Sequence, residues 1–184
     1  MNVKEVTRRE IEAKLSTIGD YVKMDYLQTC LKKSLDFDTR KFVLTRLSAT
    51  YESRKMFLEA AKLMRSAADI NATHESKMND FVKSSELFIK AGDYQEADNT
   101  LTKALASATS SQKIAIKIRM KDSYKAQAKE LLTKDKRKHA MDAYEKLLTQ
   151  DLDPLEKKEA QKSLLYLYEK LGKIQSFYAL QKVM

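Results

Sequence analysis

The sequence predicts an all-α protein built from about five antiparallel helix pairs. The chain of 184 residues contains only three Gly and one Pro, while Lys, Glu, Ala, Leu and Met, which favour helices, are abundant. Hydrophobic residues make up 43% of the chain, which is enough to build a core. A helical hairpin pattern recurs at intervals of 36 to 43 residues. A strand-rich fold is therefore not expected.

The clearest hairpin spans residues 81–105, FVKSSELFIKAGDYQEADNTLTKAL. Its first half places apolar residues on one side of a helix, and its second half does the same after a tight turn at 91–93. The apolar positions are Phe81, Leu87, Phe88, Tyr94, Ala97, Leu101, Ala104 and Leu105. Because one such hairpin cannot bury its own apolar face, the pattern predicts neighbouring copies.

This spacing resembles the tetratricopeptide repeat, whose pattern runs from a large apolar residue through a small residue, an aromatic and a turn glycine to an Ala-x3-Phe pair. The matching positions are Phe81, Ser85, Phe88, Gly92, Tyr94, Ala97 and Leu101, whereas the Trp and the closing Pro of the repeat are missing. The phrase KAGDYQEA is also similar to the helical-hairpin arrays of vesicle-fusion attachment adaptors. The resemblance implies a TPR-like α-solenoid, a right-handed superhelix whose first helices line a concave face that binds peptides or helices.

The hairpin recurs on both sides of residues 81–105. Copies lie 37 residues earlier, at Leu44, Ser48, Tyr51, Phe57, Ala60, Met64 and Ala67, and 43 residues later, at Tyr124, Ala128, Leu131, Ala140, Tyr144 and Leu147. The flanking units match less well, as is typical of end units whose outer faces meet water. In the last unit Phe177 stands where Ala97 was, which predicts wider helix packing there.

Five units of one continuous domain, residues 1–184, follow from this alignment. They span about 3–36, 40–71, 77–109, 112–151 and 154–184. Their turn positions are Gly19, Lys55, Gly92, Asp135 and Gly172, separated by 36, 37, 43 and 37 residues. The connections between units contain Asp, Asn, Ser and Thr, which favour helix N-caps, and Pro154 suits the first turn of a helix.

The sequence contains no enzyme motif. His74 and His139 lie 65 residues apart, and neither has a neighbour at metal-ligand spacing. Cys30 lies on an amphipathic helix and is interpreted as a small buried hydrophobe rather than a nucleophile. We therefore expect a non-enzymatic protein with no catalytic, metal-binding or cofactor-binding residues and no cofactor.

The cysteine content and the apolar runs bear on location. A single cysteine excludes an internal disulfide and fits a reducing compartment. The first 15 residues mix charges of both signs and lack the apolar centre of a signal peptide, and no run approaches the roughly 18 apolar residues of a membrane span. The sequence predicts a cytoplasmic protein without membrane insertion and leaves its oligomeric state open.

Positive charge is concentrated between Lys113 and Lys138. This segment holds ten Lys or Arg against three Asp or Glu, which is +7 of the chain's +9. Lysines at 113, 117, 121, 125 and 129 recur every four residues and form a stripe on a helix. The stripe is either a solvated face or a surface for an anionic partner. Nucleic acid is the less favoured anion, because Tyr124 is the only aromatic residue of the segment.

The expected function is a non-enzymatic adaptor or scaffold that binds a peptide or helix of a partner protein, with an acidic segment against the lysines. The candidate partner-binding residues are Lys121, Lys125, Lys129, Lys162, Tyr166, Asn79 and Glu86, and the groove positions of the third unit also include Val82 and Ile89. In the structural alternative, the lysines pair with Glu159 and Glu169 and only solubilise the helix. Two other functions stay open: a basic nucleic-acid-associated protein that uses Lys113 to Lys138, and a subunit that self-associates through its end units.

Overall fold

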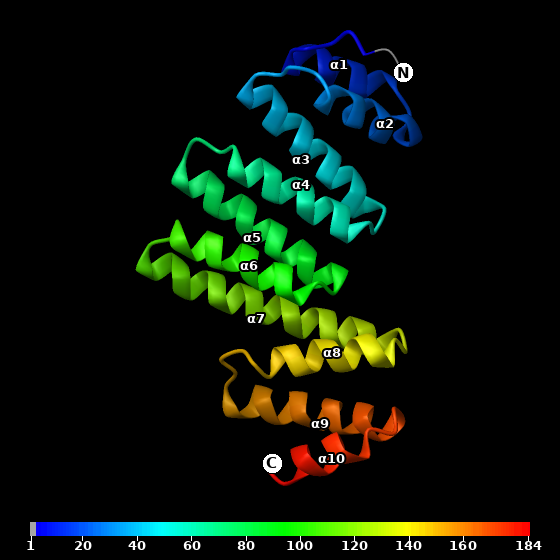
Figure 1. Cartoon of the computed structure of the whole chain (residues 1–184), viewed down its shortest axis with the longest axis vertical. Helices are drawn as coiled ribbons and strands as arrows, with labels where there is room; N and C mark the ends of the chain where they lie inside the picture. Colours follow the sequence, from blue (N-terminus) through cyan, green and yellow to red (C-terminus); the bar gives the residue numbers. More distant parts are fainter. Residues whose placement is uncertain (1–2) are drawn as a thin grey trace. The chain divides into compact units, whose positions relative to one another are not determined.

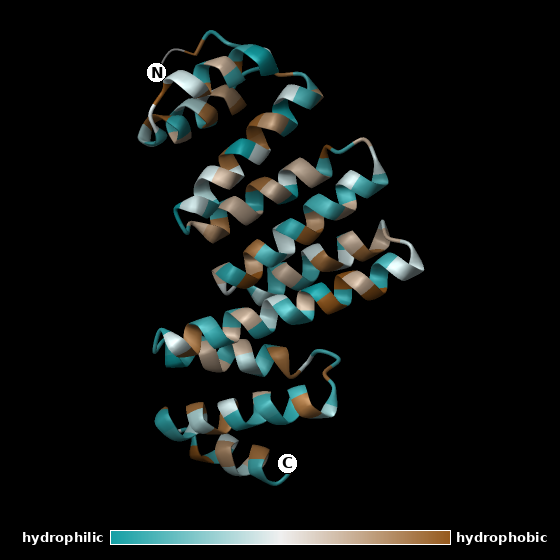
Figure 2. Ribbon diagram, turned by 180° about the vertical axis from the view of Figure 1, so that it is seen from behind, coloured by the Kyte–Doolittle hydropathy of each residue, from teal (hydrophilic) through white to brown (hydrophobic). Residues whose placement is uncertain are grey.

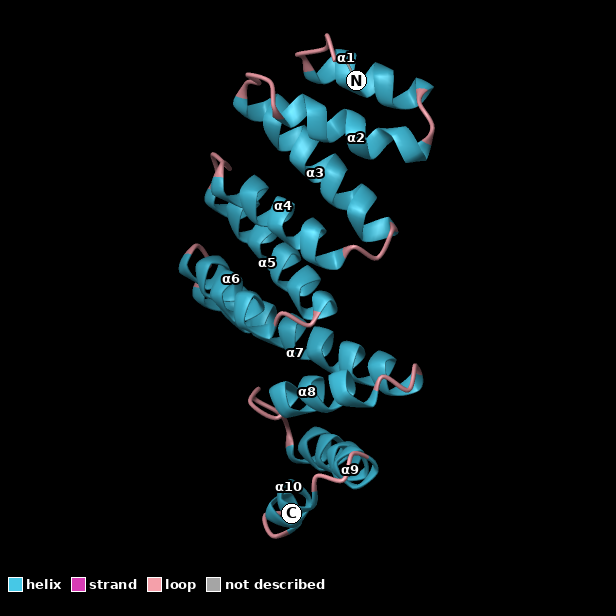
Figure 3. Cartoon of the chain, turned by 45° about the vertical axis from the view of Figure 1, so that its right-hand side comes forward, coloured by secondary structure: helices cyan, strands magenta, loops and turns pink. Residues whose placement is uncertain are grey.

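The computed structural model describes residues 3–184, which contain ten α-helices and no strand (Figure 3). The all-α prediction is confirmed. In chain order the helices are α1 (Arg8–Thr17), α2 (Asp20–Leu31), α3 (Phe37–Ser53), α4 (Phe57–Asp69), α5 (His74–Ala91), α6 (Tyr94–Ala106), α7 (Ser110–Thr133), α8 (Arg137–Leu147), α9 (Pro154–Lys170) and α10 (Ile174–Gln181). Two helices correspond to each of the five ranges that the sequence predicts, although α3, α5 and α7 start two or three residues before their ranges.

The chain divides into two compact units, Met1–Lys113 and Ile114–Met184. The boundary lies near the start of α7, within the fourth of the predicted ranges. Helices α1 to α6 belong to the first unit, and α7 from Ile114 onward belongs to the second unit with α8, α9 and α10. That residues 1–184 form one continuous domain stays a prediction.

Within the first unit, helices that follow one another in the chain pack side by side from α2 to α6, and α1 packs against α3 (Figure 1). Hydrophobic and hydrophilic residues are mixed along each of these ribbons (Figure 2). The largest fully buried side chains of this unit are Ile11, Tyr26, Leu27, Leu47, Phe81, Leu87, Phe88 and Ile89. In the hairpin of residues 81–105 the core contains the predicted apolar positions Phe81, Leu87, Phe88, Ala97 and Ala104, whereas Tyr94, Leu101 and Leu105 are only half-buried.

A side-chain hydrogen bond recurs in two neighbouring hairpins. Ser48 Oγ donates to the Ala60 carbonyl at 2.8 Å, and Ser85 Oγ donates to the Ala97 carbonyl at 2.8 Å. All four residues are buried. Because the two pairs are related by the 37-residue shift of the sequence, the structural equivalence of these hairpins is confirmed.

Four of the five predicted turn positions share a left-handed backbone. The φ angle is 61° at Lys55, 80° at Gly92, 54° at Asp135 and 66° at Gly172. A Cβ atom built on Gly92 would meet nothing within 4 Å, so the glycine serves the positive φ rather than a close approach. Each position ends the first helix of a hairpin.

The same two backbone hydrogen bonds close each of these turns. In the third unit the Gly92 N–H donates to the Ile89 carbonyl and the Asp93 N–H donates to the Phe88 carbonyl, both at 3.0 Å. The corresponding bonds recur at Lys55, Asp135 and Gly172 with lengths of 2.8 to 3.1 Å. This pairing of bonds is the Schellman motif.

Gly19 lies in the connection between α1 and α2, as predicted, but it does not share the left-handed backbone of the other four turn positions. Gly19 has a φ of −69° and is the N-cap of α2, where its carbonyl accepts from the Val22 N–H at 3.0 Å. Helix α1 ends at Thr17 and an extended Ile18 follows, so the chain enters α2 directly without a left-handed turn. A glycine is favoured at both helix ends, and spacing alone did not separate the two.

Side-chain caps explain why two helices start about three residues before the predicted units. Asp36 accepts from the Thr39 N–H at 2.8 Å and starts α3 at Phe37. Thr73 accepts from the Ser76 N–H at 3.3 Å and starts α5 at His74. Short polar side chains in the connections thus extend the helices toward their N-termini.

In the second unit, α8 packs on α9 and α9 packs on α10. The most deeply buried large side chains are Met120, Tyr124, Met141, Leu147, Leu164 and Leu167. Helix α10 has no buried residue, and Ile174 and Tyr178 are 66% and 58% exposed. Phe177 therefore does not replace the buried alanine of the other hairpins, and α10 is only loosely covered.

Candidate functional site

Two lysines of α7 converge on one carboxylate of α9. Lys121 Nζ lies 2.8 Å from Glu156 Oε2, and Lys125 Nζ lies 3.0 Å from Glu156 Oε1. Glu156 is held in the first turn of α9 by a capping box with Asp153, in which the Asp153 side chain accepts from the Glu156 N–H at 2.8 Å. The capping box thus holds the Glu156 carboxylate beside Lys121 and Lys125 of the lysine stripe.

This arrangement shifts the titration of all three side chains. Hydrogen bonds from Lys121 and Lys125 lower the pKa of Glu156 from 4.5 to about 2. The hydrogen bonds with Glu156 raise the pKa of Lys121 and Lys125. The three groups therefore stay charged across the neutral range, and Glu156 balances one of the two positive charges within the protein.

The pH dependence of stability is expected to reveal the Glu156 contact. Because the folded pKa of Glu156 is depressed to about 2, its stabilisation is present above pH 4.5 and is lost as the pH falls toward 2. Glu156→Gln removes this charge but keeps a residue suited to the capping box. Urea unfolding should show the wild type more stable at pH 7, with the difference vanishing near pH 2. A difference that does not change with pH contradicts the assignment.

The lysine side of α7 and the start of α9 border a depression of about 300 Å³. It is lined by Lys125, Lys129, Tyr144, Leu147, Leu152, Glu156, Glu159, Ala160, Lys162 and Ser163. Lys129 and Lys162 are exposed, and neither forms an ion pair within residues 3–184. Two cations without carboxylate partners thus border an apolar floor.

The predicted site residues of the second unit are brought together in part. Lys125, Lys129 and Lys162 line the depression, whereas Lys121 lies beside it through the shared Glu156. Tyr166 does not line it; the ring is 45% exposed and lies 5.6 Å from Lys170 Nζ. The acidic partner of the lysines is Glu156, and the sequence-based alternative of Glu159 and Glu169 missed it.

The remaining predicted positions lie on α5, in the first unit. Asn79 is exposed and Glu86 is partly exposed. Val82 and Ile89 are 2% and 0% exposed, so their assignment to an open groove is wrong. These two side chains belong to the core, because α5 packs against both α4 and α6 and keeps little apolar surface free.

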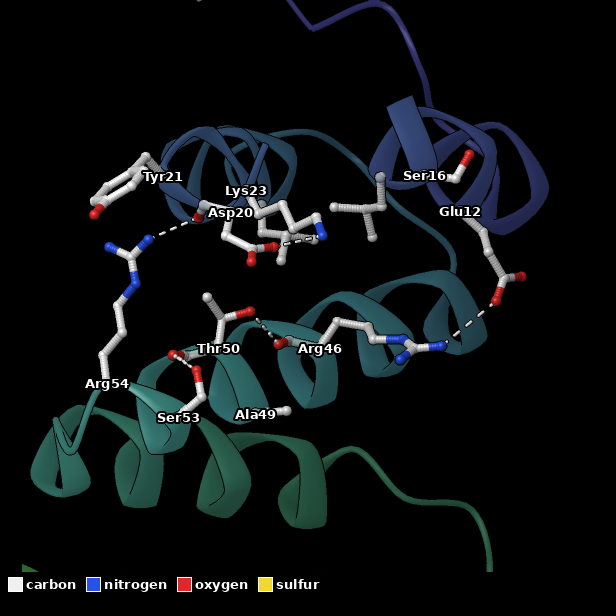
Figure 4. A pocket seen from close by; sticks show the side chains of 12 residues that line it. Glu12, Ser16, Asp20, Tyr21, Lys23, Arg46, Ala49, Thr50, Ser53 and Arg54 are labelled. Carbon is white, nitrogen blue, oxygen red and sulfur yellow. Dashed lines mark hydrogen bonds and ion pairs between the residues drawn. The ribbon is translucent and has the colours of Figure 1, made fainter. Parts of the chain in front are cut away.

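A larger hollow of about 850 Å³ lies in the first unit, where α3 faces α1 and α2 (Figure 4). Arg46 of α3 reaches Glu12 of α1 at 3.6 Å. Arg54 donates through Nη2 to the Asp20 carbonyl at 2.7 Å, and its guanidinium carbon lies 5.3 Å from the centre of the Tyr21 ring. The sequence analysis did not identify this hollow; its one signal is that an arginine within α3, Arg46, is followed eight residues later by Arg54 at the C-cap of the same helix.

The charges of this hollow are largely balanced among its own residues. A hydrogen bond from Lys23 at 2.7 Å lowers the pKa of Asp20, which keeps that carboxylate charged. Tyr21 is 88% exposed. The hollow is therefore a mixed polar surface, lined by three cations and two carboxylates.

Residues that could carry out catalysis or bind metal are dispersed in the part of the chain that the structure describes. No group of three or more His, Cys, Asp and Glu side chains there could hold a metal ion. Cys30 is fully buried, and burial raises the pKa of its thiol, which disfavours the reactive thiolate. His74 and His139 are exposed. From residue 3 to 184, no helix has the length and apolar character needed to cross a bilayer.

Comparison with known proteins gives a weak structural likeness and no sequence match. No known family has a sequence profile that matches this chain, and no curated protein sequence matches it at a significant level. Among solved structures, the chain is similar to the crystal structure of BtubC (BKLC) from P. vanneervenii, with a TM-score of 0.40 and 15% sequence identity. The match covers 92% of this chain and 73% of that one. Likeness at this level carries no argument about function.

Proposed function

We propose that the protein is a non-enzymatic adaptor that binds an acidic segment of a partner protein at the depression bordered by α7 and α9. The observation that carries this proposal is the pair of lysines, Lys129 and Lys162, that flank an apolar floor without carboxylate partners. The neighbouring Lys121 and Lys125 are held by Glu156 and form the fixed border of the site.

The proposal includes the finer architecture, a TPR-like right-handed α-solenoid of five hairpins in one domain, working in the cytoplasm. The recurrent serine-to-carbonyl bonds and the left-handed turns spaced 37, 43 and 37 residues apart support a repeat of one hairpin type. Repeats of this kind use their surfaces for binding other proteins. That reasoning is by analogy of fold.

Nucleic acid is the weaker partner. Tyr124, the one aromatic residue between Lys113 and Lys138, is 1% exposed and offers no surface on which a base could stack. Two lysines of the stripe are already paired with Glu156. Self-association has one observation in its favour, the exposed apolar side chains of α10 and the residues after it, including Ile174, Tyr178, Val183 and Met184.

The test uses the purified chain and a panel of fluorescent synthetic peptides that interleave Glu or Asp with Leu or Phe. Lys129→Glu with Lys162→Glu should weaken binding at least tenfold, because a charge-assisted contact shielded from water contributes about 1.5 to 3 kcal/mol. The matched control is Lys157→Glu with Lys158→Glu, two exposed lysines of α9 that do not line the depression. It carries the same change in net charge and should bind almost as the wild type does.

Three outcomes contradict the proposal. The first is that no acidic peptide binds the wild type, and the second is that both double variants weaken binding equally. The third is that a single-stranded oligonucleotide binds more tightly than every peptide, with the steep salt dependence of counterion release. Sedimentation of the wild type alone tests self-association.

A further inference from the structure

One side of α7 between Ile114 and Ala126 is apolar and uncovered. Ile114 and Ile118, one turn apart, are 64% and 52% exposed. A shallow hollow of about 530 Å³ runs along this side and is lined by Ala115, Ile118, Arg119, Asp122, Ser123 and Ala126, all from the same helix. Large isoleucines beside small residues form a ridge and a groove on the helix surface.

Helix α7 therefore has three sides with different chemistry. Ile116, Met120 and Tyr124 are buried. Lys117 and Lys121 belong to the lysine stripe. Each follows an isoleucine by three residues and lies about 60° around the helix from it, because successive residues of an α-helix are rotated by about 100°. The apolar side and the basic side thus run next to each other.

A peptide bound to this surface has to form the hydrogen bonds of its backbone N–H and C=O groups within itself. The described part of the chain has no strand, so it offers no sheet edge to which an extended peptide could add. The N–H and C=O groups in the middle of α7 are engaged in the hydrogen bonds of the helix. An α-helix satisfies its own backbone groups, and the small residues Ala115, Ser123 and Ala126 let it approach closely.

The charge of the segment decides which helix fits. Residues 113 to 138 carry +7, so a ligand with acidic residues beside its apolar stripe is electrostatically complementary. Asp122 is exposed on the apolar side itself. The position of the ligand that lies opposite Asp122 therefore has to be neutral or basic, which fixes a register.

We propose that the exposed side of α7 from Ile114 to Ala126 binds an acidic amphipathic α-helix of a partner protein. The apolar stripe of the partner packs on Ile114 and Ile118, and its carboxylates lie beside Lys117 and the lysines that follow it. This inference rests on the proposed adaptor function and adds a second contact surface, on α7, to the depression bordered by α7 and α9.

The probe is an 18-residue synthetic peptide with Leu at helical i, i+3, i+4 and i+7 spacing and Glu elsewhere. A second peptide has the same composition apart from two central Pro residues, which break the helix. Ile114→Ser with Ile118→Ser should weaken binding of the helical peptide about tenfold or more, through the loss of buried apolar area. Leu155→Ser with Ile174→Ser, at 69% and 66% exposure, is the matched control and should have no effect.

Asp122→Lys provides a gain of affinity. It replaces the one carboxylate that lines this hollow with a cation and should tighten binding of the 18-residue helical Leu/Glu peptide severalfold. Because Asp122 is exposed, the substitution leaves the core untouched.

The outcomes separate this inference from the adaptor function. If the Pro-containing peptide binds as tightly as the helical one, or the isoleucine variant binds normally, the inference is wrong, while sensitivity to Lys129 and Lys162 still supports the adaptor function. If neither isoleucine nor lysine changes affect peptide binding, both proposals fail. If the isoleucine variant abolishes only self-association in sedimentation, the surface binds a second copy of the chain and the inference is wrong.

Discussion

Phe88→Ala is expected to lower the free energy of unfolding by about 3 to 5 kcal/mol, the range for truncating a fully buried aromatic side chain. Phe88 is 0% exposed in α5, and the guanidinium carbon of Arg65 lies 5.3 Å from the centre of its ring. Removing the ring leaves a cavity between α5 and its neighbours and exposes the Arg65 side chain to a void. Urea unfolding of the purified variant measures the loss.

The matched control for this change is Phe37→Ala. Phe37 is 75% exposed at the start of α3, so its truncation should change stability by no more than about 0.5 kcal/mol. Equal losses in the two variants would mean that burial of Phe88 does not stabilise the hairpin.

Ala97→Leu is expected to cost about 1 to 3 kcal/mol through overpacking. Ala97 is 0% exposed in α6, and its carbonyl accepts the hydrogen bond from Ser85 of α5 at 2.8 Å. Both observations place the backbones of α5 and α6 close together at this position. The added side chain has to push the helices apart and strain that bond.

Ala13→Leu in α1 provides the comparison for Ala97, because Ala13 is exposed and the same atoms are added in water. Thermal unfolding of the two variants should show a lower midpoint only for the change at 97. A normal midpoint for Ala97→Leu means that the two helices have room for a larger side chain there.

The repeat was predictable from the sequence because it depends on local spacing. A 37-residue shift aligns Ser48 with Ser85 and Ala60 with Ala97. In each hairpin the serine donates the same hydrogen bond to the carbonyl of the alanine. Helix existence followed from composition and periodicity. Gly19 lies between the first two helices as predicted, but spacing did not show that it starts α2 rather than ends α1, because glycine suits either end of a helix.

The candidate site was less predictable because it depends on contacts between residues far apart in the chain. Glu156 lies 31 and 35 residues from the lysines that it binds, and its aim is set by the capping box at the start of α9. Periodicity placed Val82 and Ile89 on an open face, whereas helices on both sides of α5 cover them. Helix periodicity states which residues share a face but not which neighbour covers that face.

The left-handed turns at Lys55 and Asp135 mark two positions where the folded protein is less stable than it could be. Both residues carry a Cβ atom in a conformation that Gly92 and Gly172 adopt without steric cost, and that cost is about 1 to 2 kcal/mol for a residue with a side chain. The geometry of the hairpin, rather than the turn residue, therefore determines the conformation. Replacing Lys55 or Asp135 with Gly would remove this conformational cost at an exposed position, without changing any packed side chain.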